Sequence, residues 1–230
     1  MVDAEHQRMP AIPNLGDVQS GDHLSMASVV ALASEGGDPM RLGAVVRRAP
    51  QLMTALRAAR EVDPPDWLVT AGAVRDAVWD ALQGRPPTAA PRDVDLAFFD
   101  PVDLSSGREQ AVEARLKALT PDVWWEARNK AGAHLWYRKA FGIDVPPFAS
   151  SAEAIATFPE TASCVGIRLL SDDDLLVVAP HGLDDLLDGI CRHNGTLLPA
   201  ELYEYRVTEK GWRMRWPGLT YIDAARDHNA

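Results

Sequence analysis

The stretch from residue 67 to residue 100 constrains the fold of this chain more than any other part of the sequence. It reads WLVTAGAVRDAVWDALQGRPPTAAPRDVDLAFFD. Trp67–Thr70 is short and apolar, as a buried strand is, and apolar residues then recur at helical spacing from Gly72 onward. Gly84 and the prolines after it end that helix, and the run from Asp93 to Phe99 indicates a second strand. The stretch therefore predicts a strand–turn–helix–loop–strand unit.

Two carboxylates stand in the second of these strands. Asp93 and Asp95 are two positions apart, so in an extended chain both side chains project from the same face. Their neighbours Val94 and Leu96–Phe99 are apolar. Placing two like charges beside an apolar run is costly unless a cation neutralises them, and a divalent ion does this best. The pair therefore indicates a metal site.

The rest of the chain predicts an α+β fold, in which helices flank a mixed sheet. Strand-like and helix-like segments alternate, but the apolar runs 164–170 and 175–179 are separated by three aspartates and predict a hairpin late in the chain. Helix starts are indicated by Asp38-Pro39 and by the pairs Ser106 with Glu109 and Ser150 with Glu153. The aromatic stretch from Tyr203 to Tyr221 is expected to pack back on the body.

A chain of 230 residues is sufficient for one substantial domain. Residues 1–37 are polar and weakly periodic and predict a flexible segment with a short helix at 25–33. Residues 38–222 then form a single domain, followed by a tail at 223–230.

Composition excludes several classes of protein. The chain has 47% hydrophobic and 24% charged residues, a typical composition for a globular protein. Its sequence has no apolar run long enough to span a bilayer and no signal peptide. We therefore expect a cytoplasmic protein without membrane contact. The two cysteines, Cys164 and Cys191, are expected to be reduced core residues. The net charge of −10 argues against extended nucleic-acid binding, which needs a basic surface.

The turn before the helix predicts an anion site. Backbone N–H groups at a helix N-terminus attract phosphate, and Gly72 stands at that point. Arg75, one turn further, either contacts phosphate oxygens or pairs with Asp76 or Asp80, on the side of the helix opposite its apolar stripe. A phosphate site beside paired carboxylates is what phosphoryl or nucleotidyl transfer through two Mg²⁺ ions needs.

These motifs resemble the nucleotidyltransferase superfamily of DNA polymerase β. VTAGAVRDAVWDALQGRP followed by RDVDL is similar to the G-G-x-V-R-D and D-x-D pattern of CCA-adding enzymes, although Ala71 replaces the first glycine. Residues from about 40 to 220 resemble a bacterial nucleotidyltransferase family, through WEARNKAGAHLWY, FPETASCVGIRL and APHGLDDLLDG. In the first of these blocks Gly132 and Ala133 replace an arginine and a methionine.

The resemblance implies roles for individual residues. Asp93 and Asp95 are implied as the metal ligands, holding two Mg²⁺ ions, with Mn²⁺ as an alternative. A third carboxylate is usual, and Glu126 is the candidate, unless it is a strand-edge charge paired with Arg128. Asn129 is implied to bind the nucleotide or, alternatively, to cap a loop.

The implied reaction is Mg²⁺-dependent transfer of a nucleoside monophosphate from an NTP to an acceptor hydroxyl, with release of pyrophosphate. The acceptor is, in order of preference, a small molecule, a protein side chain or an RNA end. Arg168 is expected to have a carboxylate partner, such as one at the metal site. Trp124, Trp125 and Trp136 are candidates for stacking on a base, or for packing. The alternative function is a non-catalytic module that keeps the fold and binds a nucleotide or a partner protein.

Overall fold

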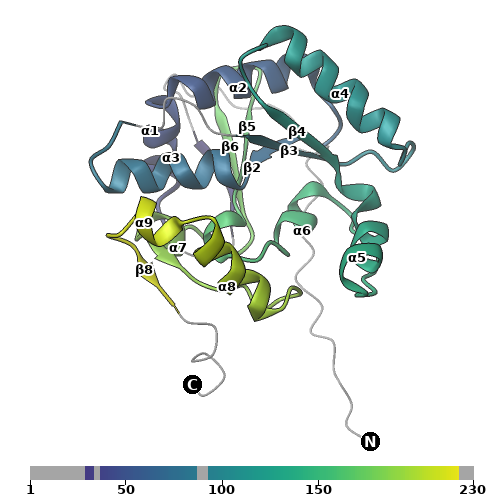
Figure 1. Cartoon of the computed structure of the whole chain (residues 1–230). Helices are drawn as coiled ribbons and strands as arrows, with labels where there is room; N and C mark the ends of the chain where they lie inside the picture. The colour runs from purple at the N-terminus through teal and green to yellow at the C-terminus, as the bar shows by residue number, and fades with distance from the viewer. Residues whose placement is uncertain (1–28, 34–36, 87–92, 223–230) are drawn as a thin grey trace, which may run out of the picture.

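The computed structural model describes residues 29–33, 37–86 and 93–222, and a six-stranded mixed sheet lies at its centre (Figure 1). Its strands are β1 (Val29–Ala33), β2 (Leu68–Thr70), β3 (Val94–Phe98), β4 (Trp125–Asn129), β5 (Gly166–Leu169) and β6 (Leu175–Ala179). Their order is β1-β6-β5-β2-β3-β4. The pairs β1–β6 and β3–β4 are parallel and the other three pairs are antiparallel. The predicted α+β class with a mixed sheet is confirmed.

Helices flank this sheet. They are α1 (Pro39–Arg47), α2 (Pro50–Val62), α3 (Gly72–Leu82), α4 (Ser106–Leu119), α5 (Ala133–Phe141), α6 (Ser151–Ile155), α7 (Asp184–Leu187), α8 (Ala200–Glu209) and α9 (Trp212–Arg215). Two 3-10 helices, η2 (Lys130–Gly132) and η3 (Thr161–Ser163), and a parallel pair of short strands, β7 (Ile190–Cys191) and β8 (Thr220–Tyr221), complete the fold. Within the described ranges, no helix has both the length and the apolar character that crossing a bilayer requires.

Several helix ends follow the predicted signals. Asp38 Oδ1 accepts a hydrogen bond from Met40 N at 2.8 Å, and Pro39 occupies the first turn of α1. Ser150 Oγ accepts from Glu153 N at 3.1 Å at the start of α6. Gly84 has a φ of +66° just after α3, a backbone conformation that favours glycine. The predicted hairpin also forms, from β5 and β6.

Helix α4 begins differently from the expected capping box. Its N-cap is Ser105, not Ser106, and Ser105 Oγ accepts from Arg108 N at 3.3 Å. The Glu109 side chain reaches away from the helix end, and its Oε1 accepts from Asn129 N at 2.8 Å. Glu109 therefore joins α4 to the edge strand β4. Local sequence spacing does not reveal this contact between distant parts of the chain.

The expected short helix at 25–33 is wrong for its described part. Val29–Ala33 forms β1 and pairs in parallel with β6, because its β-branched residues suit a strand and β6 offers it an edge to join. The sheet therefore begins inside the segment that was expected to be flexible. The remainder of that expectation, residues 1–28, and the expected tail at 223–230 lie outside the described residues.

The two faces of the sheet are covered unequally. On the first face, apolar side chains of β2 to β6 join those of α1–α4 in the main core. On the second face, a smaller cluster joins Leu68, Ala97 and Leu176 to Ile155 of α6. Since side chains alternate along a strand, residues two positions from Leu68 and Ala97 also lie on the second face. The candidate carboxylates belong to this less covered side.

The C-terminal segment packs against α3, as the aromatic stretch predicted. The ring of Trp79 makes edge contacts with Trp212 and Trp216, at centroid distances of 5.7 and 5.2 Å. In Figure 1 the yellow α8 and α9 lie below α3. This layer also covers the side of α3 opposite its apolar stripe, so Arg75 and Asp80 are only 5% and 4% exposed.

Candidate active site

The turn between β2 and α3 has a strained backbone. Ala71 has φ +53° and ψ −122°, a conformation that L-residues other than glycine rarely adopt. The strand before it is fixed, since Thr70 Oγ1 donates to Val165 O at 2.6 Å. Arg75 N donates to Ala71 O at 2.9 Å, which starts the helix at once. The glycine-like turn is therefore retained although its residue is alanine.

Gly72, the predicted phosphate-binding glycine, is the first residue of α3. A Cβ built there would meet, among the described atoms, only Arg75 Nη2, at 3.9 Å. The described residues therefore leave open space at this position. The N–H groups of the first helical turn have no partner within the helix, and this open helix end can receive an anion.

Strand register brings the polar side chains of three strands into one row. Thr70 of β2 is the register partner of Asp95 in β3, and Asp95 is the register partner of Glu126 in β4. All three lie on the second face of the sheet. Asp93 directly precedes β3 and, two positions from Asp95, belongs to the same face. The structure therefore brings the three predicted carboxylates together at the end of the sheet where α3 begins.

Electrostatics distinguish Asp95 within this group. Burial raises the pKa of Asp95, and the negative charges of Asp93 and Glu126 raise it further, while Lys130 and Arg75 oppose the shift. The surroundings of Asp95 therefore do not fully compensate the negative charge of its carboxylate. A cation at this place would remove the imbalance.

Lys130 is a site residue that the sequence reasoning missed. It is the first residue of η2, and its Nζ lies 5.3 Å from the centroid of the Phe158 ring. Burial lowers the pKa of Lys130, and the charge of Asp95 opposes that effect. The signal in the sequence was a lysine that directly follows the strand carrying Glu126. The family resemblance pointed to its neighbour Asn129 instead.

Glu126 shows the alternative contact that the sequence left open. Its Oε2 lies 3.5 Å from Arg128 Nη2, and Arg128 also pairs with Glu113 at 3.1 Å. In the part of the chain that the structure covers, no set of three or more His, Cys, Asp and Glu side chains is arranged to hold a metal ion. Glu126 is thus directed toward Arg128 at the sheet edge. A different rotamer of Glu126 is needed to complete a three-carboxylate site.

The surroundings of Arg75 differ from those expected of a phosphate ligand. Its guanidinium lies 4.2 Å from the Trp212 ring centroid and pairs with Asp76 at 2.7 Å. Its Nη1 donates to Ser163 Oγ at 2.9 Å, and Ser163 Oγ donates to Glu160 Oε2 at 2.8 Å. The predicted pairing with Asp76 is thus present. These partners occupy the guanidinium, so the geometry favours contacts of Arg75 within the protein over a phosphate contact.

Asn129 adopts the loop-capping alternative. Its Nδ2 donates to the carbonyl oxygens of Asp100 and Asp103, at 2.8 and 2.9 Å. Its Oδ1 accepts from the backbone nitrogens of Asp100 and Ala131. Both donors and both acceptor positions of this amide are occupied. The geometry thus favours a structural role, and we do not carry the nucleotide-binding prediction for Asn129 forward.

Other predictions concern residues away from this site. Arg168 has the expected carboxylate partner, but this is Asp63, at 3.2 Å, and not a carboxylate of the candidate metal site; its guanidinium also lies 5.3 Å from the Trp67 ring centroid. Asp173, in the hairpin turn, pairs with Arg60 at 2.6 Å. Both cysteines are buried and free, as predicted.

Comparison with known proteins identifies related sequences and folds. A family model described as Nucleotidyltransferase matches residues 57–221, a range that includes the turn at Ala71 and all three carboxylates. No curated protein matches the chain. An NMR structure described as revealing a CCA-adding enzyme head domain is 28% identical with a TM-score of 0.69, and the match covers 80% of this chain and 96% of that one.

Two larger structures show more distant similarity. A tRNA-processing enzyme in an apo form is 16% identical with a TM-score of 0.42, over 73% of this chain and 44% of that one. A complex of a CCA-adding enzyme with CTP is 15% identical with a TM-score of 0.43, over 76% and 47%. The match spans less than half of either protein, and these scores support no inference about this chain.

Proposed function

Because the chain belongs to the nucleotidyltransferase family, we propose that it transfers a nucleoside monophosphate from an NTP to an acceptor hydroxyl group. The acceptor oxygen forms a bond to the α-phosphorus, and the bond from that phosphorus to the oxygen bridging to the β-phosphate breaks. Pyrophosphate leaves, and the hydroxyl proton passes to water. The observation that carries this proposal is the row Thr70, Asp95 and Glu126, set beside the N-terminus of α3.

The start of α3 receives the triphosphate in this proposal. Its first N–H groups, which have no partner within the helix, and the space that the described residues leave at Gly72 suit phosphate oxygens, which the helix dipole also attracts. Lys130, whose charge acts on Asp95, adds a positive charge near the phosphates. Catalysis then consists mainly of positioning and of charge stabilisation.

In this proposal Asp93 and Asp95 hold two divalent metal ions. Mg²⁺ is the physiological ion, and Mn²⁺ can replace it. The residues fit such ions, because burial and neighbouring carboxylates leave Asp95 with excess negative charge. When bound, the ions supply positive charge to the attacking and leaving oxygens. Glu126 joins them after it leaves Arg128.

The acceptor that we favour is a small molecule. The net charge of −10 disfavours a long nucleic-acid partner, whose phosphates need a basic surface. A protein hydroxyl and an RNA end come second and third. We place the reaction in the cytoplasm, where NTPs are abundant and where thiols stay reduced, as the two free cysteines suit.

One observation favours a second candidate function, a non-catalytic nucleotide-binding or partner-binding module. Glu126 is paired with Arg128 at 3.5 Å, and such a pair, if permanent, leaves the metal site with two carboxylates. A module of this kind binds NTP without releasing pyrophosphate.

Pyrophosphate release tests the proposal against this alternative. The protein is incubated with each of the four NTPs and Mg²⁺, with and without a panel of small hydroxyl compounds. Asp93→Asn and Asp95→Asn should each lower the rate by at least about 100-fold, since losing a metal ligand costs more than losing its supporting partner. Asp188→Asn is the matched control, because Asp188 forms an exposed pair with Arg41. Equal rates in all four proteins would contradict the catalytic assignment.

A further inference from the structure

The last turn of α8 lies beside the start of α3, and the ring of Trp212 joins the two. Two guanidinium groups contact this ring, that of Arg75 at 4.2 Å from the centroid and that of Arg206 at 5.5 Å. A Cβ built at Gly72 would lie 3.9 Å from Arg75 Nη2. The end of α8 is therefore next to the helix end that is proposed to receive the triphosphate.

Lys210 follows Arg206 by one helical turn. Its backbone N–H donates to Arg206 O at 3.2 Å. Residues four apart on a helix are neighbours on one face, so Lys210 stands on the same face of α8 as Arg206. Gly211, with a φ of +66°, then turns the chain into α9. The fold therefore sets an exposed lysine at the point where the C-terminal layer meets the start of α3.

The charges around Lys210 also place it near the candidate metal ligands. Partial burial lowers the pKa of Lys210, and the charges of Arg206 and Arg75 lower it further. The negative charges of Asp93 and Glu160 oppose this shift. Since charges act only over short distances in salt solution, Asp93 lies close to Lys210. The lysine therefore faces the same space as the candidate metal site.

Lys210 differs from the two neighbouring arginines in its contacts. Arg75 pairs with Asp76 at 2.7 Å, and Arg206 pairs with Glu160 at 2.5 Å. Among the residues that the structure describes, the side chain of Lys210 forms no ion pair or hydrogen bond. An ammonium group can donate three hydrogen bonds. Lys210 therefore remains available to an anionic ligand.

Two lysines meet the carboxylates from different elements. Lys130, in η2 directly after β4, interacts with Asp95, whereas Lys210, at the end of α8, interacts with Asp93. Through Trp212, Lys210 is on the same side as the start of α3, where the triphosphate is proposed to bind. Transfer through two metal ions needs positive charge at the leaving oxygen as well as at the attacking one. Lys210 is therefore on the side of the leaving group.

We propose that Lys210 binds the β- and γ-phosphates of the NTP and stabilises the pyrophosphate that leaves. This inference rests on the proposed function, which supplies the NTP and the direction of transfer. As the bond from the α-phosphorus to the bridging oxygen breaks, its electron pair stays on that oxygen, and the ammonium group compensates the charge. Lysine suits this role because its compact charge on a flexible stem binds phosphate.

Calorimetry on the full-length protein in Mg²⁺ tests this contact. The probes are inorganic pyrophosphate, the four nucleoside monophosphates and the four NTP analogues with a methylene group between the α- and β-phosphorus. Loss of a charged hydrogen bond lowers affinity by about tenfold or more. We expect Lys210→Gln to weaken binding of pyrophosphate and of the analogues by at least this factor, and to leave monophosphate binding unchanged. Lys210→Arg, which keeps the charge, should retain most of the affinity.

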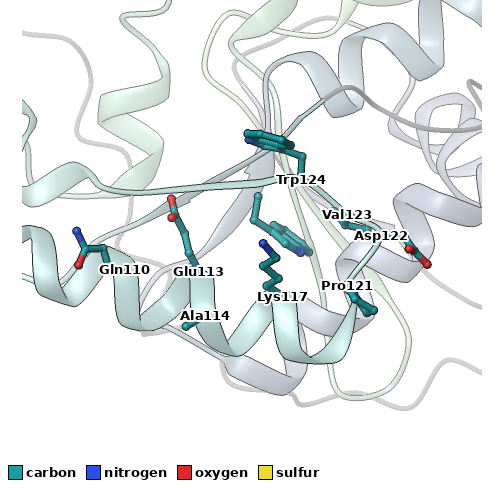
Figure 2. Close-up of a pocket in the computed structure, with 9 residues that line it drawn as sticks. Gln110, Glu113, Ala114, Lys117, Pro121, Asp122, Val123 and Trp124 are labelled. Atoms are coloured by element: carbon teal, nitrogen blue, oxygen red, sulfur yellow. The ribbon is translucent and has the colours of Figure 1, made fainter.

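Lys117→Gln is the matched control. Figure 2 shows Lys117 on α4, in a groove of about 420 Å³ beside the start of β4. Helix α4 packs on the first face of the sheet, whereas the candidate carboxylates lie on the second. Both lysines are exposed, so each substitution removes one positive charge and leaves the core intact. The control should bind all three kinds of probe as the wild-type protein does.

The possible outcomes separate this inference from the proposed function. Unchanged binding of the NTP analogues by Lys210→Gln overturns the inference, and so does a wild-type protein that binds neither pyrophosphate nor any analogue. If the substitution weakens monophosphate binding as much as analogue binding, Lys210 meets the α-phosphate and the leaving-group assignment is wrong. If it weakens analogue binding while pyrophosphate release does not depend on Asp95, the phosphate contact stands and the catalytic proposal fails.

Discussion

Asp95 of β3 and Glu126 of β4 are register partners in a parallel pair, so both carboxylates project from the same face of the sheet. This relationship explains why the charge of Glu126 contributes to the raised pKa of Asp95. It also explains how the edge strand can complete a site begun by Asp93 and Asp95. In the structure Glu126 contacts Arg128 instead, and this contact opposes completion of the three-carboxylate site.

Asp95→Asn should stabilise the metal-free protein at pH 7. The pKa of Asp95 in the folded state lies above its ordinary value of 3.8, so its ionisation costs stability as the pH rises from 3.8 through the folded-state pKa. Asparagine avoids this cost. Urea unfolding at pH 7 and at pH 3, without divalent ions, measures the difference, which should vanish at pH 3. A less stable variant at pH 7 would contradict the assigned burial of charge.

Ala71→Gly should raise the free energy of unfolding by about 1 kcal/mol. A strained backbone of this kind costs on the order of 1–3 kcal/mol, which exceeds the roughly 0.5–1 kcal/mol that glycine's greater flexibility costs. Ala81→Gly, in the last turn of α3, is the matched control and should destabilise by up to about 1 kcal/mol. Thermal unfolding compares the two variants. The same sign for both substitutions would show that Ala71 is not strained.

Arg75→Lys should destabilise the fold by about 3 kcal/mol, because it breaks a buried ion pair and removes a planar group stacked on Trp212. Denaturant unfolding measures the loss. Arg138→Lys, whose side chain forms an exposed pair with Asp144, is the control and should change little. A fully stable Arg75→Lys protein with a raised KM for NTP would instead support the phosphate-binding role.

Lys130→Gln should raise the KM for NTP by about tenfold, since charged hydrogen bonds contribute roughly 1.5–3 kcal/mol. It should also move the acidic limb of the pH–rate profile to higher pH, because Lys130 lowers the pKa of Asp95. Steady-state kinetics across pH measure both effects. Lys139→Gln, an exposed change on α5, is the control. A raised KM without any shift of the pH profile would place Lys130 away from Asp95.

Sequence predicted the local elements of the site more successfully than their surroundings. The strand–turn–helix–strand unit and the common face of Asp93 and Asp95 follow from periodicity, which is a local property. The burial of Arg75 depends on Trp212, more than a hundred residues later, and the place of β1 depends on β6. Such long-range contacts leave no periodic signal. Lys130 was missed for the same reason, since its relation to Asp95 joins the end of β4 to the neighbouring strand β3.

The most direct test of the central claim is anomalous diffraction from crystals soaked with Mn²⁺ and a non-hydrolysable NTP analogue. The account predicts manganese density between Asp93 and Asp95, the triphosphate at the start of α3, and Glu126 turned from Arg128 toward the ion. Nucleotide bound with no manganese at Asp93 and Asp95, or manganese bound only elsewhere, would contradict it.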